Sequence, residues 1–300
     1  SLAPRFAANN FTNPSPSMMK GMFERRLMAS DRDTIKRSFS KAAATYDEFA
    51  LFQKDVACEV FKRLFQMLGQ RTHATAKAPS AGKSVEKSFF LDIGSGTGAL
   101  AGLVSSSMPG TKACASDIAA GMLQKAREKH GDALLLAAAD CCSLSFGEGV
   151  FDSIGSSLAL QWAGDLPLAL REAARVLKPG GLFVFSTLAP STLWELRECY
   201  KSYGKIEFQD RASIESAIKA SGLEAVLIEE RIIKRRYKSF IELLKALKNI
   251  GAAPPMERGK GLSPGKRLKE AGKLYAERFP SPQGGIEASY ALIIAGLRKV

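Results

Sequence analysis

The amino-acid sequence predicts an α/β fold: a mostly parallel sheet of seven strands, with helices on both faces and a helical cap. From residue 88 onward, short apolar segments alternate with segments of helical pattern, as in proteins whose strands run parallel. A glycine-rich turn over 94–98 follows the first apolar segment, and an aspartate stands at or beside the end of each of the first three. Ligands of open α/β sheets bind at this end of the strands, so the same observations predict a binding site.

Each element is predicted from its own stretch of sequence. Phe39, Tyr46 and Gln53 recur every seven residues, nearly two helical turns, so residues 32–67 predict a helix with these side chains on one face. Small, polar and basic residues predict a linker loop over 69–87. Apolar runs predict strands over 88–93, 112–117, 133–139, 151–157, 182–187, 223–233 and 288–298. Helical patterns cover 118–129, 166–177, 191–203, 211–220 and 240–250, and a basic loop is expected over 256–273.

These predictions divide the chain into consecutive parts. Cap helices are expected at 31–68, the linker loop at 69–87 and the ligand-binding core at 88–190. Residues 191–300 are expected to add further cap helices and the last two strands. Residues 1–30 carry four basic side chains and one acid and lack a helical period; this composition predicts a disordered leader or tag remnant in preference to an organelle transit peptide.

The net charge of +13 is distributed unevenly along the chain. Residues 1–87 carry 15 basic and 8 acidic side chains, residues 88–190 carry 7 and 9, and residues 191–300 carry 21 and 13. Within the last part, 231–273 holds 13 basic and 3 acidic side chains. Basic flanks attract an acidic partner, which can be nucleic acid, an anionic membrane surface or an acidic protein. Few aromatic side chains interleave with the basic run, which disfavours stacking on nucleic-acid bases.

The cysteine and histidine content favours a cytoplasmic protein that binds no metal. The five cysteines are odd in number and form no C-x-x-C pair, as expected of reduced thiols. The two histidines, His73 and His130, lack partners at the spacing of zinc ligands. No stretch reaches the ~18 uncharged apolar residues that a membrane-spanning helix needs, so no membrane association is expected.

The glycine-rich turn differs from that of a dinucleotide-binding protein. Gly94, Gly96 and Gly98 form G-x-G-x-G just after Asp92, whereas a dinucleotide site reads G-x-G-x-x-G. A dinucleotide brings a pyrophosphate, which a neighbouring acid repels. S-adenosylmethionine has no phosphate and carries an ammonium and a sulfonium, so an acid beside the turn favours its binding.

Two further aspartates fit the same ligand. Asp117 ends the second predicted strand, where a carboxylate can accept hydrogen bonds from both ribose hydroxyls. Asp140 ends the third strand, where it can accept from the adenine amino group. Each aspartate alone is as readily explained as a helix cap. Three acids at the ends of successive strands favour the cofactor site.

Together these residues resemble the class I S-adenosylmethionine methyltransferases. The motifs that carry the resemblance are Leu91–Gly98, Asp117, Asp140–Cys141 and Arg175–Gly181. It covers about residues 88–190 and implies the Rossmann-like fold of that class. The residues then expected to bind the cofactor are Gln53, Asp92, Gly94, Ser95, Gly96, Gly98, Asp117, Ile118, Met122, Asp140, Cys141 and Ser156.

A narrower resemblance covers roughly residues 34–298. Phe39–Tyr46 with Gln53, Ser156–Trp162 and Leu247–Ala252 are similar to segments of the malonyl-acyl-carrier-protein O-methyltransferases of biotin synthesis. The resemblance implies methylation of the free carboxylate of malonyl-acyl carrier protein, an acidic protein partner that the basic flank suits. A carboxylate with a pKa near ~4 is already ionised at neutral pH and needs no general base.

Three side chains are candidates for the reaction itself. Tyr46 is expected to cover the methionine end of the cofactor or to hydrogen-bond the substrate, with core packing as the alternative. Trp162 is expected to wall the path of methyl transfer or to pack in the core. Arg197 can pair with the malonyl carboxylate, although its Leu/Glu/Arg-rich helix favours an exposed surface role.

Two other functions remain open at the level of the sequence. One is methylation of a different small carboxylic acid or of RNA. The other is a cofactor-binding assembly factor that does not methylate. Formation of S-adenosylhomocysteine with each acceptor separates these alternatives.

Overall fold

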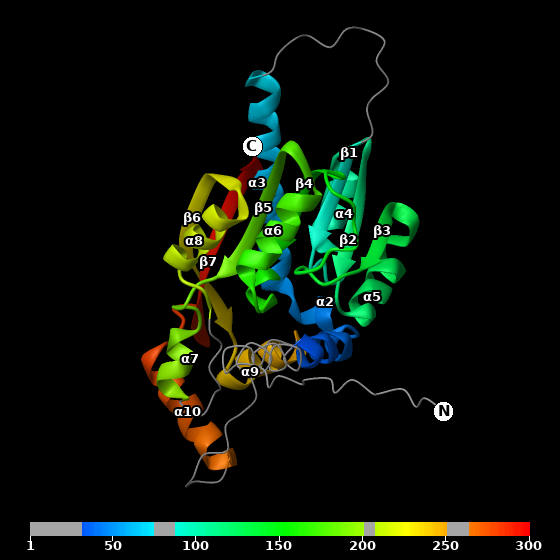
Figure 1. Ribbon diagram of the computed structural model, residues 1–300. Helices are drawn as coiled ribbons and strands as arrows, with labels where there is room; N and C mark the ends of the chain where they lie inside the picture. Colours follow the sequence, from blue (N-terminus) through cyan, green and yellow to red (C-terminus); the bar gives the residue numbers. More distant parts are fainter. Residues whose placement is uncertain (1–31, 75–87, 201–207, 251–263) are drawn as a thin grey trace, which may run out of the picture.

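The computed structural model describes residues 32–74, 88–200, 208–250 and 264–300, and these residues contain a single seven-stranded sheet (Figure 1). The strands are β1 (Ser88–Ile93), β2 (Thr111–Asp117), β3 (Leu134–Ala138), β4 (Phe151–Ser157), β5 (Leu177–Leu188), β6 (Leu223–Tyr237) and β7 (Ile286–Lys299). Their order is β3-β2-β1-β4-β5-β7-β6. The first five are parallel, and β7 runs antiparallel to both β5 and β6. The predicted sheet is therefore confirmed.

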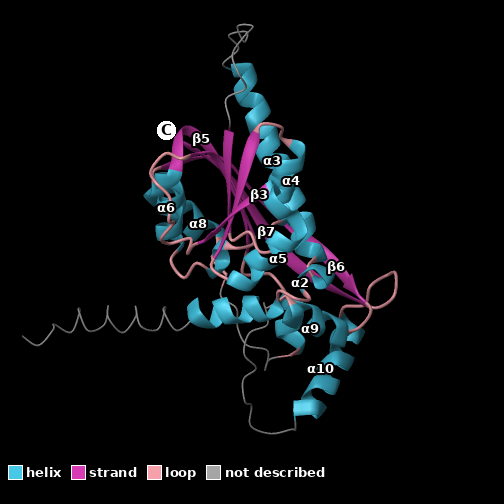
Figure 2. Ribbon diagram, turned by 90° about the vertical axis from the view of Figure 1, so that its right-hand side faces the viewer, coloured by secondary structure: helices cyan, strands magenta, loops and turns pink. Residues whose placement is uncertain are grey.

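Helices cover both faces of the sheet, as Figure 2 shows. On one face, α3 (Leu51–Ala74) packs on β4, β5 and β7, and α4 (Ala99–Ser107) on β1 and β2. On the other, α6 (Leu166–Val176) and α8 (Arg211–Ser221) pack against each other and against β5 and β6. The helix α5 (Ala120–His130) lies along β2 and β3. Strand β7 is buried along almost its whole length, because it has neighbours on both sides and helices above and below.

Local signals in the sequence explain where several elements begin and end. The side chain of Asp165 accepts a hydrogen bond from the backbone N–H of Leu168 (2.9 Å), and Pro167 stands in the first turn, so α6 begins there. Gly222 adopts a left-handed conformation that ends α8 and turns the chain into β6. These short connections hold the helices in register with the strands that follow them.

Further helices lie beyond the carboxyl ends of the parallel strands and form the cap (Figure 1). They are a helix over residues 32–42, α2 (Tyr46–Phe49), α7 (Trp194–Cys199), α9 (Phe240–Asn249) and α10 (Pro264–Arg278). The aromatic rings of Phe240 and Tyr275 lie 5.4 Å apart and join α9 to α10. The cap therefore combines segments from both ends of the described chain.

The N-terminal helical region differs from the prediction of one helix over 32–67. It is interrupted by a turn at 43–45 and again at Ala50, and α3 continues to Ala74, into the region expected to be linker. The breaks occur because Ala43 packs against Ala119 and Met122, away from the sheet, whereas Val60 and Leu64 of α3 are fully buried on it. Helix α3 is thus part of the core, and only the residues before it belong to the cap.

The basic loop expected over 256–273 is also corrected, because Pro264–Arg278 forms α10. Ala271 and Tyr275 are buried one turn apart on this helix, an apolar face that the surrounding lysines and glycines conceal in the sequence. The leader at 1–30, the linker at 75–87 and parts of the 191–203 and 256–273 segments lie outside the described residues. Within the ranges given above, the structure has no helix both long and apolar enough to span a bilayer.

Substitutions in α3 test whether this helix belongs to the core. Leu64→Ala, at a fully buried position, should lower the free energy of unfolding by about 2–5 kcal/mol. Phe65→Ala is the matched control: its side chain is 56% exposed, and it should change stability by no more than about 0.5 kcal/mol. Denaturant unfolding measures both, and equal effects of the two substitutions would contradict the placement of α3 on the sheet.

Candidate active site

A cavity at the carboxyl ends of β1 to β4 brings together most of the predicted cofactor residues. We call it the main cavity. Its walls are Arg32, Ile35, Phe39, Tyr46, Ile93, Gly94, Gly96, Asp117, Ile118, Met122, Ala139, Asp140, Cys141, Ser157, Leu158, Ala159, Trp162 and Ala163. The walls combine an acid at each of two neighbouring strand ends with a largely apolar surround, as expected for a nucleoside with a polar ribose and a flat base.

The side chain of Asp117 binds the backbone of the glycine turn. One carboxylate oxygen accepts from the backbone N–H of Gly96 and the other from that of Ala119, both at 2.8 Å. Gly94 has φ of +67°, and a Cβ there would lie 2.2 Å from the Cβ of Ala159. Only glycine fits at this crossing of two loops. Burial raises the pKa of Asp117 despite these hydrogen bonds, and further hydrogen bonds from a ligand would favour its charged form.

Asp92 lies deeper, beside a smaller inner cavity, which also includes Lys54, Ser95 and Thr97. Its side chain is 1% exposed, and one carboxylate oxygen accepts from the backbone N–H of Ala101 at 3.0 Å. The other oxygen is buried and has no hydrogen-bond partner among the described residues. Burial, with a smaller contribution from the carboxylate of Asp117, raises the pKa of Asp92 to about 8. An ammonium group in the inner cavity would supply the missing partner and restore the charged form.

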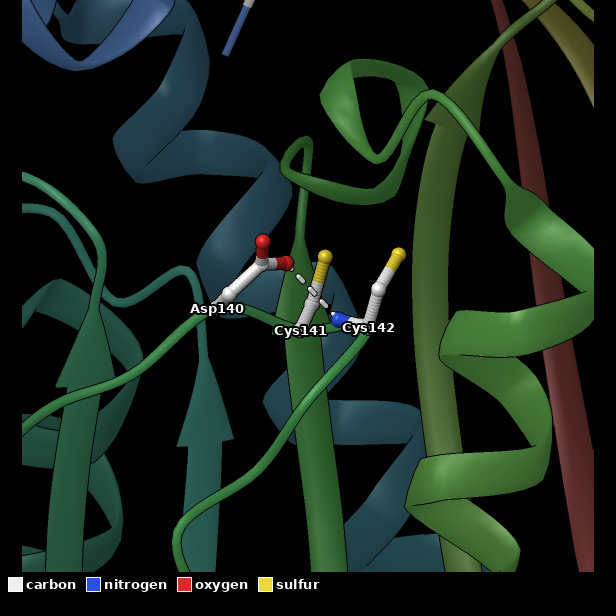
Figure 3. Close-up of side chains that lie close together, drawn as sticks. All are labelled: Asp140, Cys141 and Cys142. Atoms are coloured by element: carbon white, nitrogen blue, oxygen red, sulfur yellow. Dashed lines mark hydrogen bonds between the residues drawn. The ribbon is translucent and has the colours of Figure 1, made fainter. Parts of the chain in front are cut away.

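Asp140 and Cys141 line the main cavity, and Cys142 lies beside them (Figure 3). The carboxylate of Asp140 accepts from the backbone N–H of Cys142 at 2.8 Å and pairs with Arg32 at 3.0 Å. The hydrogen bond to Cys142 and burial raise the pKa of the Cys141 thiol, which stays neutral. The three side chains lie within 4.8 Å of one another, as metal ligands would. Because Asp140 already faces a cation and an N–H donor, the arrangement suits a wall for the adenine better than a metal site.

Tyr46 stands where three cavities meet. It lines the main cavity, the inner cavity and a third, largely apolar cavity that continues under the cap. Burial, with the nearby carboxylates of Asp117 and Asp47, raises the pKa of Tyr46, so its hydroxyl remains a hydrogen-bond donor. The position is fixed by the next residue, Asp47, which accepts from the Thr97 hydroxyl at 2.8 Å and from Lys129 at 3.1 Å. The start of the cap is thus tied to the glycine turn and to α5.

The apolar cavity lies between the main cavity and the cap. Phe39, Tyr46, Leu158 and Trp162 line both cavities, and the rings of Phe39 and Trp162 meet edge to face at 5.7 Å. The other walls come from α3, β7, α9 and neighbouring loops, and are Phe52, Gln53, Gln161, Leu188, Thr192, Leu193, Phe208, Leu247, Ile250 and Tyr290. None of these described residues is charged. The cavity therefore suits an acceptor group that enters from the cap side and meets a cofactor across Tyr46 and Trp162.

Besides Asp92 and Ser95, which line the inner cavity, four predicted site residues lie outside the main cavity. Gly98 begins α4 in a left-handed conformation and packs against His130 and Leu134. Ser156 is fully buried and donates its hydroxyl to the carbonyl of Ile93, whereas the next residue, Ser157, faces the cavity. Gln53 lines the inner and apolar cavities. The fourth is Arg197, on α7.

The predicted pairing of Arg197 with the substrate stays a prediction, and in the structure this side chain binds backbone carbonyls of its own loop. Its guanidinium donates to the backbone carbonyls of Thr192 and Pro190, the latter at 2.6 Å. The cause is the left-handed turn at Leu193, which leaves these carbonyls facing the first turn of α7. Arg197 therefore has a structural role, and it does not stand among the residues that line either cavity.

Several site residues were not among those predicted. Arg32 and Ile35 belong to the helix over 32–42, whose sequence shows an apolar period but no chemical motif. Asp47 directly follows Tyr46, and an acid beside the predicted aromatic is a signal that points to it. Leu158, with φ of +51°, has no sequence signal for its unusual conformation.

Solved structures with a similar fold include methyltransferases. Residues 91–185 match the family model described as a methyltransferase domain. A putative methyltransferase of Bacillus halodurans aligns with 80% of this chain and 98% of its own, at a TM-score of 0.55 and 15% identity. Phosphoethanolamine N-methyltransferase 2 of Haemonchus contortus, solved with S-adenosyl-L-methionine, aligns with 90% of this chain and 60% of its own, at a TM-score of 0.53 and 18% identity. Fold and site thus define a class I methyltransferase.

Similarity over nearly the whole chain narrows the class further. The malonyl-[acyl-carrier protein] O-methyltransferases of Geobacter sulfurreducens and Methylococcus capsulatus are 31% and 30% identical, across 88% and 87% of this chain and 97% and 92% of their own lengths. The chain belongs to the malonyl-[acyl-carrier protein] O-methyltransferase family. It is also 33% identical to the biotin biosynthesis bifunctional protein BioHC of Cellvibrio japonicus, of which it spans about half, 51% of the length.

Asp117→Asn tests the assignment of the ribose site. The amide keeps the size of the side chain but removes its charge and turns one acceptor into a donor that faces a backbone N–H. The dissociation constant for S-adenosylmethionine should rise about 10- to 100-fold, the range for losing a hydrogen bond to a charged group. Calorimetric titration measures it, with the exposed pair member Asp132→Asn as control. Equal affinities for the two variants would remove Asp117 from the site.

Asp92→Asn tests the buried carboxylate through its pH dependence. Because the folded-state pKa of Asp92 is raised to about 8, the free protein should lose stability as pH rises from the unfolded-state value through about 8. The asparagine variant lacks this loss and should melt higher than the parent at pH 9, with the two similar at pH 4.

The same substitution should change the number of protons that are released when the cofactor product binds. If the cofactor ammonium pairs with ionised Asp92, the parent must release a proton on binding S-adenosylhomocysteine at pH 7, whereas Asp92→Asn must release less. Calorimetry in buffers of different ionisation enthalpy measures the protons released. Identical proton release by parent and variant would show that Asp92 does not ionise on binding.

Proposed function

We propose that this chain transfers the methyl group of S-adenosylmethionine to the free carboxylate of malonyl-acyl carrier protein and so forms the malonyl methyl ester used in biotin synthesis. The observation that carries the proposal is the junction of the two cavities at Tyr46 and Trp162. On one side stand the aspartates that fit the cofactor. On the other stands an uncharged cavity whose described walls contain no histidine, lysine or acid that could act as a base.

The chemistry of a carboxylate acceptor fits these walls. A carboxylate oxygen attacks the methyl carbon, the carbon–sulfur bond breaks, and its electron pair remains on sulfur. The products are a neutral ester and the neutral sulfide of S-adenosylhomocysteine, and no proton moves. The site has only to align oxygen, carbon and sulfur and to exclude water, which the apolar walls and the cap favour. An acceptor that must lose a proton would require a general base.

The relatives' substrate supports a carrier-protein partner for this chain. The proteins of Geobacter and Methylococcus are named for malonyl-[acyl-carrier protein]. Here an outer cavity adjoins the apolar cavity, and the two share Phe52, Gln53, Leu247, Ile250 and Tyr290. It is bordered by α2, α9 and the end of β6, including Arg236. A prosthetic arm that enters through the outer cavity would bring its thioester acyl group to the main cavity while the carrier remains outside.

The charges around the outer cavity indicate which basic residues are available to a carrier protein. Arg231 pairs with Glu59, Lys234 with Glu287, and Arg235 with Asp55. The lysines on the exposed side of α9, Lys245 and Lys248, form no ion pair with any of the described residues. The proposed docking surface is therefore centred on Lys245 and Lys248, next to the entrance.

The function is tested by the acceptor that supports turnover. Formation of S-adenosylhomocysteine is measured with malonyl-acyl carrier protein, free malonate, other small carboxylic acids, RNA and no acceptor. Turnover with malonyl-acyl carrier protein well above all others supports the proposal. Faster turnover with another acid or with RNA would replace it, and binding of the cofactor without any turnover would favour an assembly factor.

Charge reversal tests the docking surface. Lys245→Glu with Lys248→Glu should lower kcat/KM for malonyl-acyl carrier protein by about ten-fold at low ionic strength, because complementary charge mainly raises the encounter rate. The difference from the parent should shrink as salt screens these charges beyond about 8 Å. Turnover of malonyl-pantetheine should stay at the parent value.

The matched control carries the same change of charge elsewhere. Lys112 on β2 and Lys219 on α8 are exposed, and neither element belongs to the cap. Lys112→Glu with Lys219→Glu should leave kcat/KM for the carrier substrate within about two- to three-fold of the parent, at the scale of ordinary surface changes. If both double variants lose the same share of kcat/KM, the loss comes from the change in net charge, and a local docking surface is contradicted.

A further inference from the structure

The apolar cavity has to hold an anion, yet its described walls contain no cation. Its polar side chains are amides and hydroxyls, from Tyr46, Gln53, Gln161, Thr192 and Tyr290. The arginines around this cavity have other partners. Arg32 faces Asp140, and Arg197 donates to backbone carbonyls. On the side of the outer cavity, Arg235 pairs with Asp55, and Arg236 donates to the carbonyl of Gln283. A carboxylate that enters this cavity therefore meets neutral donors. The hydrogen bonds that these donors already make indicate which of them receives it.

Gln161 is the polar group best prepared for this role. It stands on the short helical turn Leu160–Trp162 that follows β4, beside the tryptophan that lines both cavities. The hydroxyl of Thr187, which is 4% exposed, donates to its amide oxygen at 3.4 Å. With the oxygen used in this way, the amide NH₂ is left as a double donor. The Thr192 hydroxyl, by contrast, is bonded to the backbone of Ala291.

The turn that presents Gln161 is held rigidly. Leu158 has φ of +51°, a conformation that non-glycine residues seldom adopt. It is kept there because its backbone N–H lies 3.2 Å from the carbonyl and 3.1 Å from the hydroxyl of Ser186, a fully buried residue of β5. A strained residue held by the neighbouring strand at a binding site is a common way to aim the side chains that follow.

Neutral donors suit this reaction better than a cation would. The carboxylate loses its charge when it accepts the methyl group, so an arginine or lysine would stabilise the substrate more than the transition state and slow the transfer. An amide orients the oxygen and distinguishes an acid from an ester without neutralising the nucleophile. In surroundings of low polarity the charged carboxylate and sulfonium are poorly solvated, which favours the loss of their charges on the way to the transition state.

We propose that the amide of Gln161, oriented by Thr187, binds the carboxylate of the acceptor beside Trp162, and that the absence of a cation from the described walls there is what keeps the carboxylate nucleophilic. The inference rests on the proposed function, since it assumes a carboxylate acceptor. It assigns Gln161 as a substrate-binding residue and Thr187 as its positioning residue.

The first test compares the substrate with its product. The readout is the KM for malonyl-acyl carrier protein divided by the inhibition constant of its methyl ester, because both carry the same protein and docking contributions cancel. Gln161→Leu should raise this ratio about 10- to 100-fold, since only the acid uses the amide. The dissociation constant for S-adenosylmethionine should not change. An unchanged ratio in a folded variant would overturn the inference.

The second test adds the missing cation. Gln161→Lys should lower the KM for malonyl-acyl carrier protein or leave it unchanged, while kcat falls at least about ten-fold, because the ion pair stabilises the bound acid. A higher kcat would refute the role of neutral donors. Thr187→Val, which removes the hydroxyl that orients the amide, should shift the ratio of the first test in the same direction as Gln161→Leu, but less.

Two controls are needed. One tests whether another residue binds the carboxylate, and the other tests whether the acceptor is a different acid. Lys201 and Lys205 lie outside the described residues, so Lys201→Met and Lys205→Met are measured by the same ratio; a larger shift in either than in Gln161→Leu would assign the carboxylate to that lysine. If the parent methylates another carboxylic acid and not malonyl-acyl carrier protein, the proposed function fails, and Gln161 is then tested with that acid and its methyl ester. If it methylates no carboxylate, both fail.

Discussion

The fold has to keep the carboxylate of Asp92 inside its core without a charged partner among the described residues, and the geometry of the site follows from this constraint. One oxygen is satisfied by the backbone N–H of Ala101, which fixes the start of α4 against β1. The glycine turn must then pass between them, with Asp117 holding its backbone from the neighbouring strand. The remaining oxygen of Asp92 is left for a ligand. In the proposed function, pairing of this oxygen with the cationic cofactor would offset the free-energy cost of burying the carboxylate.

The cap completes the site with a different kind of surface. Where the sheet offers acids to a cationic cofactor, the cap offers aromatic rings, amides and hydroxyls. Tyr46 and Trp162 stand at the boundary between the two surfaces. In the proposed function, the acids attract the cationic cofactor, and the apolar walls exclude water from the anion that approaches it. Because the sheet supplies the acids and the cap supplies neutral walls, a carboxylate acceptor needs neither a general base nor a cation at the centre of the site.

The sequence was informative where chemistry requires a residue type at one position, and less so where packing decides. The strands, the glycine turn and the strand-end acids Asp92, Asp117 and Asp140 follow from local patterns. The pleat of β4 decides which of two adjacent serines faces the cavity. Ser157 lines the main cavity, whereas the predicted Ser156 is buried. The direction of Arg197 depends on a left-handed residue four positions earlier that has no sequence signature. Helix α10 went unpredicted because its buried positions are few among many lysines.

Strand β7 lies between β5 and β6, and it is the last strand along the chain. Among the described residues, β6 pairs only with β7, so β6 has no place in the sheet until β7 has been synthesised. Tyr290, on β7, also lines the apolar cavity. A chain emerging from the ribosome can therefore assemble β1 to β5 and the glycine turn while the far wall of the acceptor region is still missing. Contacts between distant segments form slowly, so the pairing of β6 with β7 and the closure of this wall come after β1 to β5 have been synthesised.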